Sequence, residues 1–294
     1  MNELALGILG GLGSAVCWAS ITILGRSISG SISPAAINAV RSVLGGLLVV
    51  VIAVAAGYGP EIVQIPLWAL LAFWVSMAIG FAIGDTVFFA GMEHLGVTRA
   101  HTLSMVHPLL TTLIGIGLLG EPISIARALG ILLVLGGLLL IVSGRGEDSP
   151  EGRASRWRGV RLVLVAAVSW TIAAVLLKAP LQGVSAMAAT AVRSPMGGLV
   201  LFLTPWARGA LRAVRGCRPP ELTRLAVICL LSFGSSLSFT AGVKHAGVAV
   251  GTVLATTSPL FTIPLEIFVL GHRPSGRTIL GAMITVAGIA LINL

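Results

Sequence analysis

The chain has 294 residues, of which 56% are hydrophobic and only 10% are charged, and its mean hydropathy is +1.03. Apolar runs of about 20 residues recur along the chain, and each is long enough as a helix to cross a hydrocarbon layer of ~30 Å. This excludes an ordinary soluble domain and predicts an all-α polytopic membrane protein. The net charge of +9 is better explained by basic loops on one membrane face than by a nucleic-acid partner.

Ten transmembrane helices are predicted in chain order. Those of the first half span residues 4–24, 34–56, 66–92, 98–119 and 124–143. Pro34 and Pro66 open the second and third spans, where proline suits a helix start. An acid, Glu3, stands where a signal peptide would have a basic region, so the first span is expected to be retained. Those of the second half span residues 161–177, 185–206, 222–243, 248–270 and 275–294.

One octapeptide occurs twice, as AVRSVLGG at residues 39–46 and AVRSPMGG at residues 191–198. The alignment extends over both halves, with one residue lost between the second and third helices of the unit. It pairs Trp18 with Trp170, His94 with His245, Gly96 with Gly247, and Pro108 with Pro259. The sequence therefore predicts one duplicated five-helix unit, with repeats at residues 1–143 and 159–294 joined by a polar linker at 144–158.

Because five is an odd number, the second unit is expected to enter the membrane from the opposite side. Such inverted repeats are related by a pseudo-two-fold axis in the membrane plane and favour a substrate site near the midplane between them. Passive channels are also built this way. Most of the 19 Lys and Arg residues fall after the odd-numbered spans, which places both termini outside the cytoplasm by the positive-inside rule.

Several motifs resemble the EamA family of the drug/metabolite transporter superfamily over nearly the whole chain. They are a central tryptophan in the first helix of each half (AVCWAS at 15–20, AVSWTI at 167–172), an early arginine in the second helix, and the segments FFAGMEHLGVTRA at 88–100 and SMVHPLLTTLIGIGLLGE at 104–121. No one of these is diagnostic alone, but their order, spacing and duplication together are specific.

The resemblance implies a ten-helix carrier that moves small organic solutes, commonly amino acids or other metabolites, outward. It also implies cytoplasmic termini, against the charge distribution. Two features depart from the family pattern. Gly271-His272 stands where the family has Gly-Glu, and Asp85, His101 and His107 occupy positions that are mostly apolar in the family.

Arg41 and Arg193 lie about two turns inside the second helix of each half. A charged group at this depth costs about 2.5–3.5 kcal/mol on insertion scales, so it usually faces a cavity or a partner. One interpretation is that they hold a substrate carboxylate or complete an ion pair in the pathway, because a guanidinium offers a bidentate fork. The other is that they reach the headgroup region or bind neighbouring backbone carbonyls.

Asp85 lies well inside the third span, with room provided by Gly80 and Gly84. It either carries a proton during transport or is fixed by an ion pair with Arg41 or a hydrogen bond to a facing hydroxyl. His107, directly before Pro108, is predicted to face a cavity. Six residues of helix place the two histidines on different sides, so they do not form a metal pair. His101 is expected to lie near the membrane surface and to be structural.

Trp18 and Trp170 are central in their spans and not at the interfaces where aromatic belts lie. They either stack on a substrate or fill space between the units. Glu266 lies near the end of the ninth span, either lining the pathway or at the interface. Small-residue helix faces such as that of Gly7 suit internal packing or a homodimer equally.

No nucleotide-binding loop, paired metal ligands or nucleophile elbow appears, so neither a cofactor, a metal nor an enzyme activity is expected. The sequence therefore predicts a multi-pass carrier in the plasma or inner membrane, acting as an exporter by alternating access. A proton or solute gradient is the expected energy source, since ATP has no site. A passive channel for small solutes is the alternative.

Overall fold

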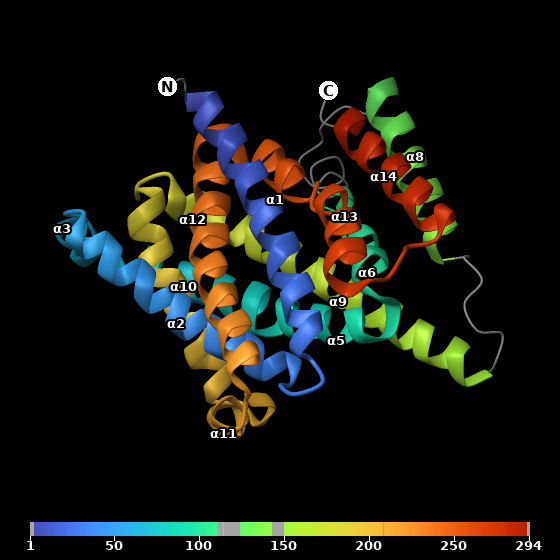
Figure 1. The fold of residues 1–294 in the computed structure, drawn as a ribbon. Coiled ribbons are helices and arrows are strands. Elements are labelled where there is room, and N and C mark those ends of the chain that lie inside the picture. The colour runs from blue at the N-terminus through green and yellow to red at the C-terminus, as the bar shows by residue number, and fades with distance from the viewer. Residues whose placement is uncertain (1–2, 111–113, 115–123, 143–149, 208, 293–294) are drawn as a thin grey trace.

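The computed structural model describes residues 3–110, 114, 124–142, 150–207 and 209–292. All regular elements in these residues are helices (Figure 1). The first half contains α1 (Glu3–Ile28), α2 (Pro34–Ala55), α3 (Gly59–Val63), α4 (Leu67–Met77), the π-helix η1 (Ala78–Asp85), α5 (Thr86–Leu95), α6 (Val97–Ser104) and α8 (Ile125–Val142). The second half contains α9 (Pro150–Leu181), α10 (Ala186–Phe202), the 3-10 helix η2 (Pro205–Ala207), α11 (Ala210–Arg215), α12 (Pro219–Ala255), α13 (Pro259–Leu270) and α14 (Gly276–Ile292).

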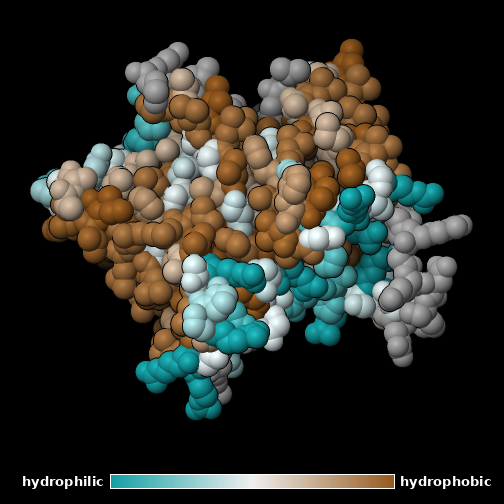
Figure 2. All heavy atoms as spheres, viewed as in Figure 1, coloured by the Kyte–Doolittle hydropathy of each residue, from teal (hydrophilic) through white to brown (hydrophobic). Residues whose placement is uncertain are grey.

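Six helical segments among the described residues are long and apolar enough to cross a membrane: Ala5–Ile28, Pro34–Ala55, Leu67–Leu95, Gly152–Leu181, Pro219–Gly247 and Gly251–Leu270. Shorter apolar helices cover Ala128–Leu140, Ala186–Phe202 and Gly276–Leu291. Large apolar side chains such as Phe268, which is 85% exposed, lie on the outside, and Figure 2 shows hydrophobic residues covering most of one face. An apolar exterior of this extent is what a lipid-facing surface requires.

The first three predicted spans are found as helices with nearly the predicted bounds. α2 begins at Pro34, and the hydroxyl of its N-cap, Ser33, accepts a hydrogen bond from the Ala36 N–H at 3.3 Å, which satisfies one of the free donors of the first turn. The predicted fourth span is described only through residue 110 and at residue 114. Its residues 111–113 and 115–119 lie outside the described part of the chain, as do residues 144–149 of the predicted linker.

Within the predicted linker, residues 150–158 form the first turns of α9. The sixth helix therefore begins at Pro150 and not at 161. The polar composition of this segment excludes it from the hydrocarbon layer, but it does not prevent helix formation, because Arg and Ala are good helix formers and proline is tolerated in a first turn.

The boundary between the predicted eighth and ninth spans lies where the structure interrupts the helix, because the candidate spans Pro219–Gly247 and Gly251–Leu270 separate there. Gly247 bends the backbone of α12 with φ 84° and ψ 163°. Gly96, the repeat equivalent of Gly247, has φ 80° and ψ 164° between α5 and α6. Only glycine adopts this region readily, so the duplicated unit contains the same backbone bend in both halves.

A second pair of equivalent interruptions follows these bends. α6 ends at Ser104 with a break at Met105, and in the second half the helix is broken at residues 256–258 before Pro259 opens α13. Pro108 and Pro259 are repeat equivalents, and a proline removes one backbone hydrogen bond from a helix. The fourth helix of each unit is therefore discontinuous at the same place.

Helices of the two halves pack against each other in a reciprocal pattern (Figure 1). The first helix of the first half, α1, packs on α12, while the first helix of the second half, α9, packs on α4, η1 and α5. Equivalent helices also pair, α2 with α10 and α8 with α14, and α6 packs on α13.

The two octapeptides cross at the α2–α10 contact. The Ser42 hydroxyl donates to the Ser194 carbonyl oxygen at 2.6 Å. A Cβ on Gly46 would lie 2.5 Å from the Pro195 nitrogen, and one on Gly198 would lie 2.8 Å from the Ala39 carbonyl oxygen. The paired glycines of the repeat therefore permit the backbones to approach closely enough for this crossing.

Candidate functional site

A cavity of about 190 Å³ lies where these helices meet, and both halves of the chain line it. Sites for drug-sized ligands are usually about 300–1,000 Å³, so the volume suits a small solute. Most of its polar lining consists of hydroxyl groups, and its charged lining consists of Arg41, Asp85 and Arg193. Both helix interruptions reach it, through Ser104, His107, Ala255, Thr256 and Ser258.

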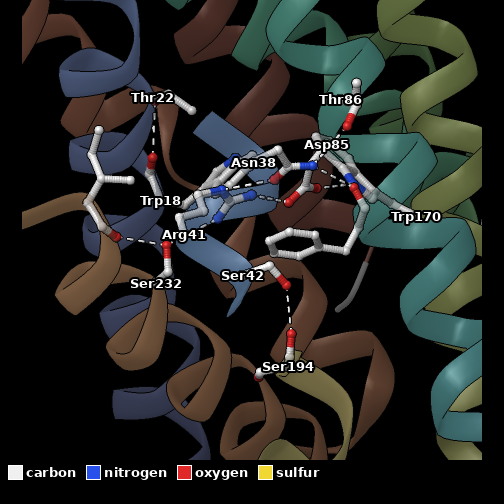
Figure 3. A network of polar contacts seen from close by, with 12 residues as sticks. Trp18, Thr22, Asn38, Arg41, Ser42, Asp85, Thr86, Trp170, Ser194 and Ser232 are labelled. Carbon is white, nitrogen blue, oxygen red and sulfur yellow. Dashed lines mark hydrogen bonds and ion pairs between the residues drawn. The ribbon is translucent and has the colours of Figure 1, made fainter. Parts of the chain in front are cut away.

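Arg41 of α2 forms a buried ion pair with Asp85, the last residue of the π-helix η1. Figure 3 shows the carboxylate between the guanidinium of Arg41 and the indole of Trp170, whose Nε1–H donates to Oδ1 at 2.8 Å. The Arg41 side chain is only 2% exposed and Asp85 7%. The structure therefore realises the fixed ion pair that was one of the two interpretations of Asp85.

Asn38 holds the guanidinium in place from one turn earlier on α2. Its Oδ1 accepts from Arg41 Nε at 2.9 Å, and its Nδ2 donates to the Phe81 carbonyl oxygen and to Thr86 Oγ1, both at 2.9 Å. Ser232 Oγ of α12 accepts from Arg41 Nη1 at 3.3 Å. Arg41 thus has a partner for each of its nitrogens.

Aromatic rings enclose the same guanidinium. Its Cζ lies 4.2 Å from the ring centroid of Phe81 and 5.2 Å from that of Trp18, distances at which a cation is attracted to the ring face. Trp18 and Trp170 contact each other edge to face, with centroids 6.0 Å apart. The two repeat-equivalent tryptophans therefore meet beside the ion pair, and both also line the cavity.

Arg193 occupies the equivalent position of α10 but has different surroundings. Its Nη1 donates to Thr240 Oγ1 at 3.3 Å, and its Nε has no hydrogen-bond partner. Among the residues that the structure describes, it forms no ion pair. The sequence explains why: the equivalents of Asn38 and Asp85 are Thr190 and Ser236.

His107 lines the cavity, as predicted, and its ring centroid lies 6.1 Å from that of Trp170. Its backbone carbonyl oxygen accepts from Thr171 Oγ1 at 3.2 Å, which ties the break of the fourth helix to α9. His101 is fixed between Thr22 Oγ1 at 2.8 Å and Ser258 Oγ at 2.9 Å, the structural position expected for it.

Glu266 lies away from the central cavity. Its carboxylate accepts from the Thr98 N–H at 3.1 Å and from the Thr98 hydroxyl, so it satisfies free donors at the start of α6. It lines a separate small pocket together with Arg99 and His272. The described structure thus places the other six predicted site residues at one cavity and Glu266 elsewhere.

Sequence reasoning missed Asn38 and the hydroxyl-bearing face of α12. Asn38 precedes Arg41 by three residues in an apolar helix, a spacing that brings side chains together. Ser232, Ser235 and Ser236 lie in the polar run SFGSS of an otherwise apolar span and face the cavity. Both signals were visible in the sequence as polar residues at membrane depth.

These features define a class: a multi-pass, all-helical membrane protein whose broken helices surround a cavity with charged and hydroxyl side chains at the contact of two repeated halves. The sequence model of the EamA-like transporter family matches residues 5–143 and 157–294. The chain belongs to this family. The predictions of the family and of a multi-pass membrane protein are confirmed.

Similar proteins agree with this assignment. A chloroplastic WAT1-related protein of Arabidopsis thaliana is 27% identical over 94% of this chain, which spans 66% of that relative. The uncharacterized transporter YvbV of Bacillus subtilis is 24% identical over 86% of this chain and 80% of its own length. A solved structure described only as "Crystal structure of protein" matches with a TM-score of 0.70 at 17% identity, covering 98% of this chain and 97% of its own, which shows the fold alone.

Proposed function

We propose that the protein is a secondary-active carrier that exports a small organic metabolite by alternating access, with its substrate site in the cavity between the repeats. The observation that carries the proposal is the pair of equivalent helix breaks, at Met105 and at residues 256–258, which both lie at the cavity. Substrate sites of secondary transporters are typically formed by discontinuous helices near the midplane. The cavity volume of about 190 Å³ favours a metabolite over a larger drug.

The proposed architecture is ten transmembrane helices in two inverted five-helix repeats. It is supported by the reciprocal packing of α1 on α12 and of α9 on α4, η1 and α5, and by the pairing of equivalent helices. A two-fold relation between the halves produces this pattern, and an odd number of helices per unit makes the axis lie in the membrane plane. The two halves can then exchange conformations, which gives the alternating openings.

A proton or a second solute is the proposed source of energy. Of the described residues that line the cavity, Asp85 is the one with a carboxylate. A proton that drives transport therefore binds to Asp85 and breaks its ion pair with Arg41. An exporter of metabolites must lie in the membrane that bounds the cell, so we propose the plasma or inner membrane as its location.

Orientation follows from the basic residues. The start of α1 and the end of α14 lie at one end of the molecule in Figure 1, and α11, which carries Arg212 and Arg215, lies at the opposite end. In Figure 2, hydrophilic residues gather around α11. The positive-inside rule places that end in the cytoplasm and the termini outside, and impermeant labelling of a cysteine introduced at Glu3 in whole cells tests this.

Counterflow in proteoliposomes distinguishes a carrier from a passive channel. Vesicles are preloaded with one unlabelled solute and diluted into a trace of the same labelled solute, for a panel of amino acids, organic acids, amines and sugars. A carrier accumulates the label transiently above equilibrium for at least one solute. Uptake without this overshoot, together with a flux that does not saturate, assigns the protein to channels and contradicts the proposal.

A further inference from the structure

Arg193 is a buried cation for which the described residues supply one hydrogen-bond acceptor. The side chain is 6% exposed and lines the central cavity. Its Nε–H has no partner, and among the described residues only Thr240 Oγ1 accepts from its guanidinium. A buried charge is stable only when it is paired and hydrogen-bonded, so this arginine lacks an anionic partner.

The charges around the cavity lead to the same requirement. Among the described residues, its charged lining is Arg41, Asp85 and Arg193, and Arg41 and Asp85 neutralise each other in their ion pair. One positive charge, that of Arg193, is left. A solute with one negative charge completes the balance, whereas a neutral or cationic solute leaves the charge unpaired or adds to it.

We propose that Arg193 binds the carboxylate of the transported solute, so that the substrate is a small organic carboxylate. A guanidinium matches a carboxylate with two parallel N–H···O bonds. Ser235 and Ser236 of α12 also line the cavity. Ser236 Oγ lies 2.9 Å from the Oγ of Ser194, the residue that follows Arg193. The hydroxyl groups are placed to donate to the carboxylate oxygens.

The rest of the cavity selects the body of the solute. Its aromatic walls are Trp18, Phe81, Trp170 and Phe239. An apolar or aromatic body therefore fits beside the carboxylate. A phosphate group carries a charge of about −1.5 to −2 near neutral pH and needs a second free cation. Arg41 does not supply one, because Asp85 holds it. The carboxylate is therefore favoured over a phosphate ester.

This inference rests on the proposed function, since it assigns the substrate class of the same cavity, but binding tests it separately from transport. The full chain is purified in detergent at constant chloride, and its thermal stability is measured with matched probes. Each set contains a carboxylate, its amide and the corresponding amine: benzoate, benzamide and benzylamine; hexanoate, hexanamide and hexylamine; lactate, lactamide and aminopropanol. Tryptophan fluorescence, which senses Trp18 and Trp170 at the cavity, gives a second readout.

We expect stabilisation by carboxylates alone, since a ligand that binds only the folded state raises its stability by mass action. Arg193→Gln should weaken the apparent affinity about 10- to 100-fold, the usual effect of losing a hydrogen bond to a charged group. Arg193→Lys, which keeps the charge without the fork, should fall between. Arg212→Gln makes the same chemical change on an exposed residue of α11 and should leave binding unchanged.

The proposal is contradicted by stabilisation by an amide or amine equal to that of its carboxylate, by carboxylate binding that persists in Arg193→Gln, or by no effect of any carboxylate up to its solubility limit. Thermal stabilisation that depends on chloride and not on the carboxylate also contradicts the proposal. Carboxylate binding at Arg193 without counterflow would instead contradict the carrier mechanism and support the assignment of Arg193. A failure of the proposed function and a failure of this inference are therefore distinguishable.

Discussion

The first half of the chain surrounds Arg41 with partners, whereas the equivalent Arg193 has a single hydroxyl as its partner among the described residues. Asp85 and Asn38 hold the first guanidinium, and Phe81 covers it. Thr190 and Ser236 stand where Asn38 and Asp85 stand in the other half. Thr190 instead bonds to the Ala186 carbonyl oxygen of its own helix at 2.6 Å.

The difference indicates how the two copies of a duplicated site acquire different roles. Both copies of the octapeptide keep the arginine and the paired glycines of the α2–α10 crossing. The neighbouring helices then determine whether the cation is neutralised inside the protein or left for a solute. One copy thereby becomes a structural ion pair at the cavity wall, and the other becomes the binding group.

The largest expected effect is on the ion pair. Arg41→Gln leaves the Asp85 carboxylate buried without its cation, and Asp85→Asn leaves Arg41 in the same condition. Each should reduce the free energy of unfolding by about 3–5 kcal/mol, whereas the double variant should regain most of the loss, because a neutral pair avoids the uncompensated charge. Denaturant or thermal unfolding in detergent measures this cycle. Additive losses in the double variant would show that the pair is not coupled.

The second prediction converts one site into the other. Ser236→Asp places a carboxylate beside Arg193 at the position equivalent to Asp85, where it should pair with the guanidinium. We expect the variant to fold and to bind carboxylate probes about 10- to 100-fold more weakly, since the internal carboxylate competes for the same donors. The isosteric control is Ser236→Asn, which adds the same bulk without charge. Equal loss of binding in both variants would attribute the effect to size.

Much of the fold could be predicted because the membrane restricts what a chain can do. The hydrogen-bonding groups of the backbone must be paired within a helix when they lie in hydrocarbon. Apolar runs of sufficient length therefore predict α1, α2 and the helical segment Leu67–Leu95. The bounds failed where this constraint is absent. The polar residues 150–158 form helix outside the apolar region, so α9 begins at Pro150 and not at 161.

The site was only partly predictable, for a related reason. Polar residues at membrane depth identified Arg41, Asp85, His107 and Arg193, since each is costly there without a partner. Which partner each one takes depends on contacts between halves, such as Trp170 with Asp85, and on the π-helix that positions Asp85. Glu266 has the same composition signal but bonds to Thr98 at a helix start. A residue type alone does not distinguish these outcomes.

A third prediction uses features that the two halves share. Gly96→Ala and Gly247→Ala each force a side chain into a glycine-only backbone region, and each should cost about 1–3 kcal/mol of stability. Steric clash is not the cause, because a Cβ would have ordinary or no contacts at these positions. Thermal unfolding of the two variants should give similar losses, and a large loss in only one of them would contradict the equivalence of the bends. Gly183→Ala, at an uncrowded glycine without a positive φ, is the control.

The smallest effect is expected at Glu266, which lies outside the comparison of the two arginines. Glu266→Gln removes the negative charge that accepts from the first turn of α6, and loss of such a cap costs about 0.5–2 kcal/mol. Carboxylate binding at Arg193 should stay unchanged, since Glu266 lines a different pocket from Arg193. Thermal stability and probe affinity measured on the same sample separate the two effects. A fall in probe affinity as large as that of Arg193→Gln, with little loss of stability, would instead place Glu266 on the path that the solute takes.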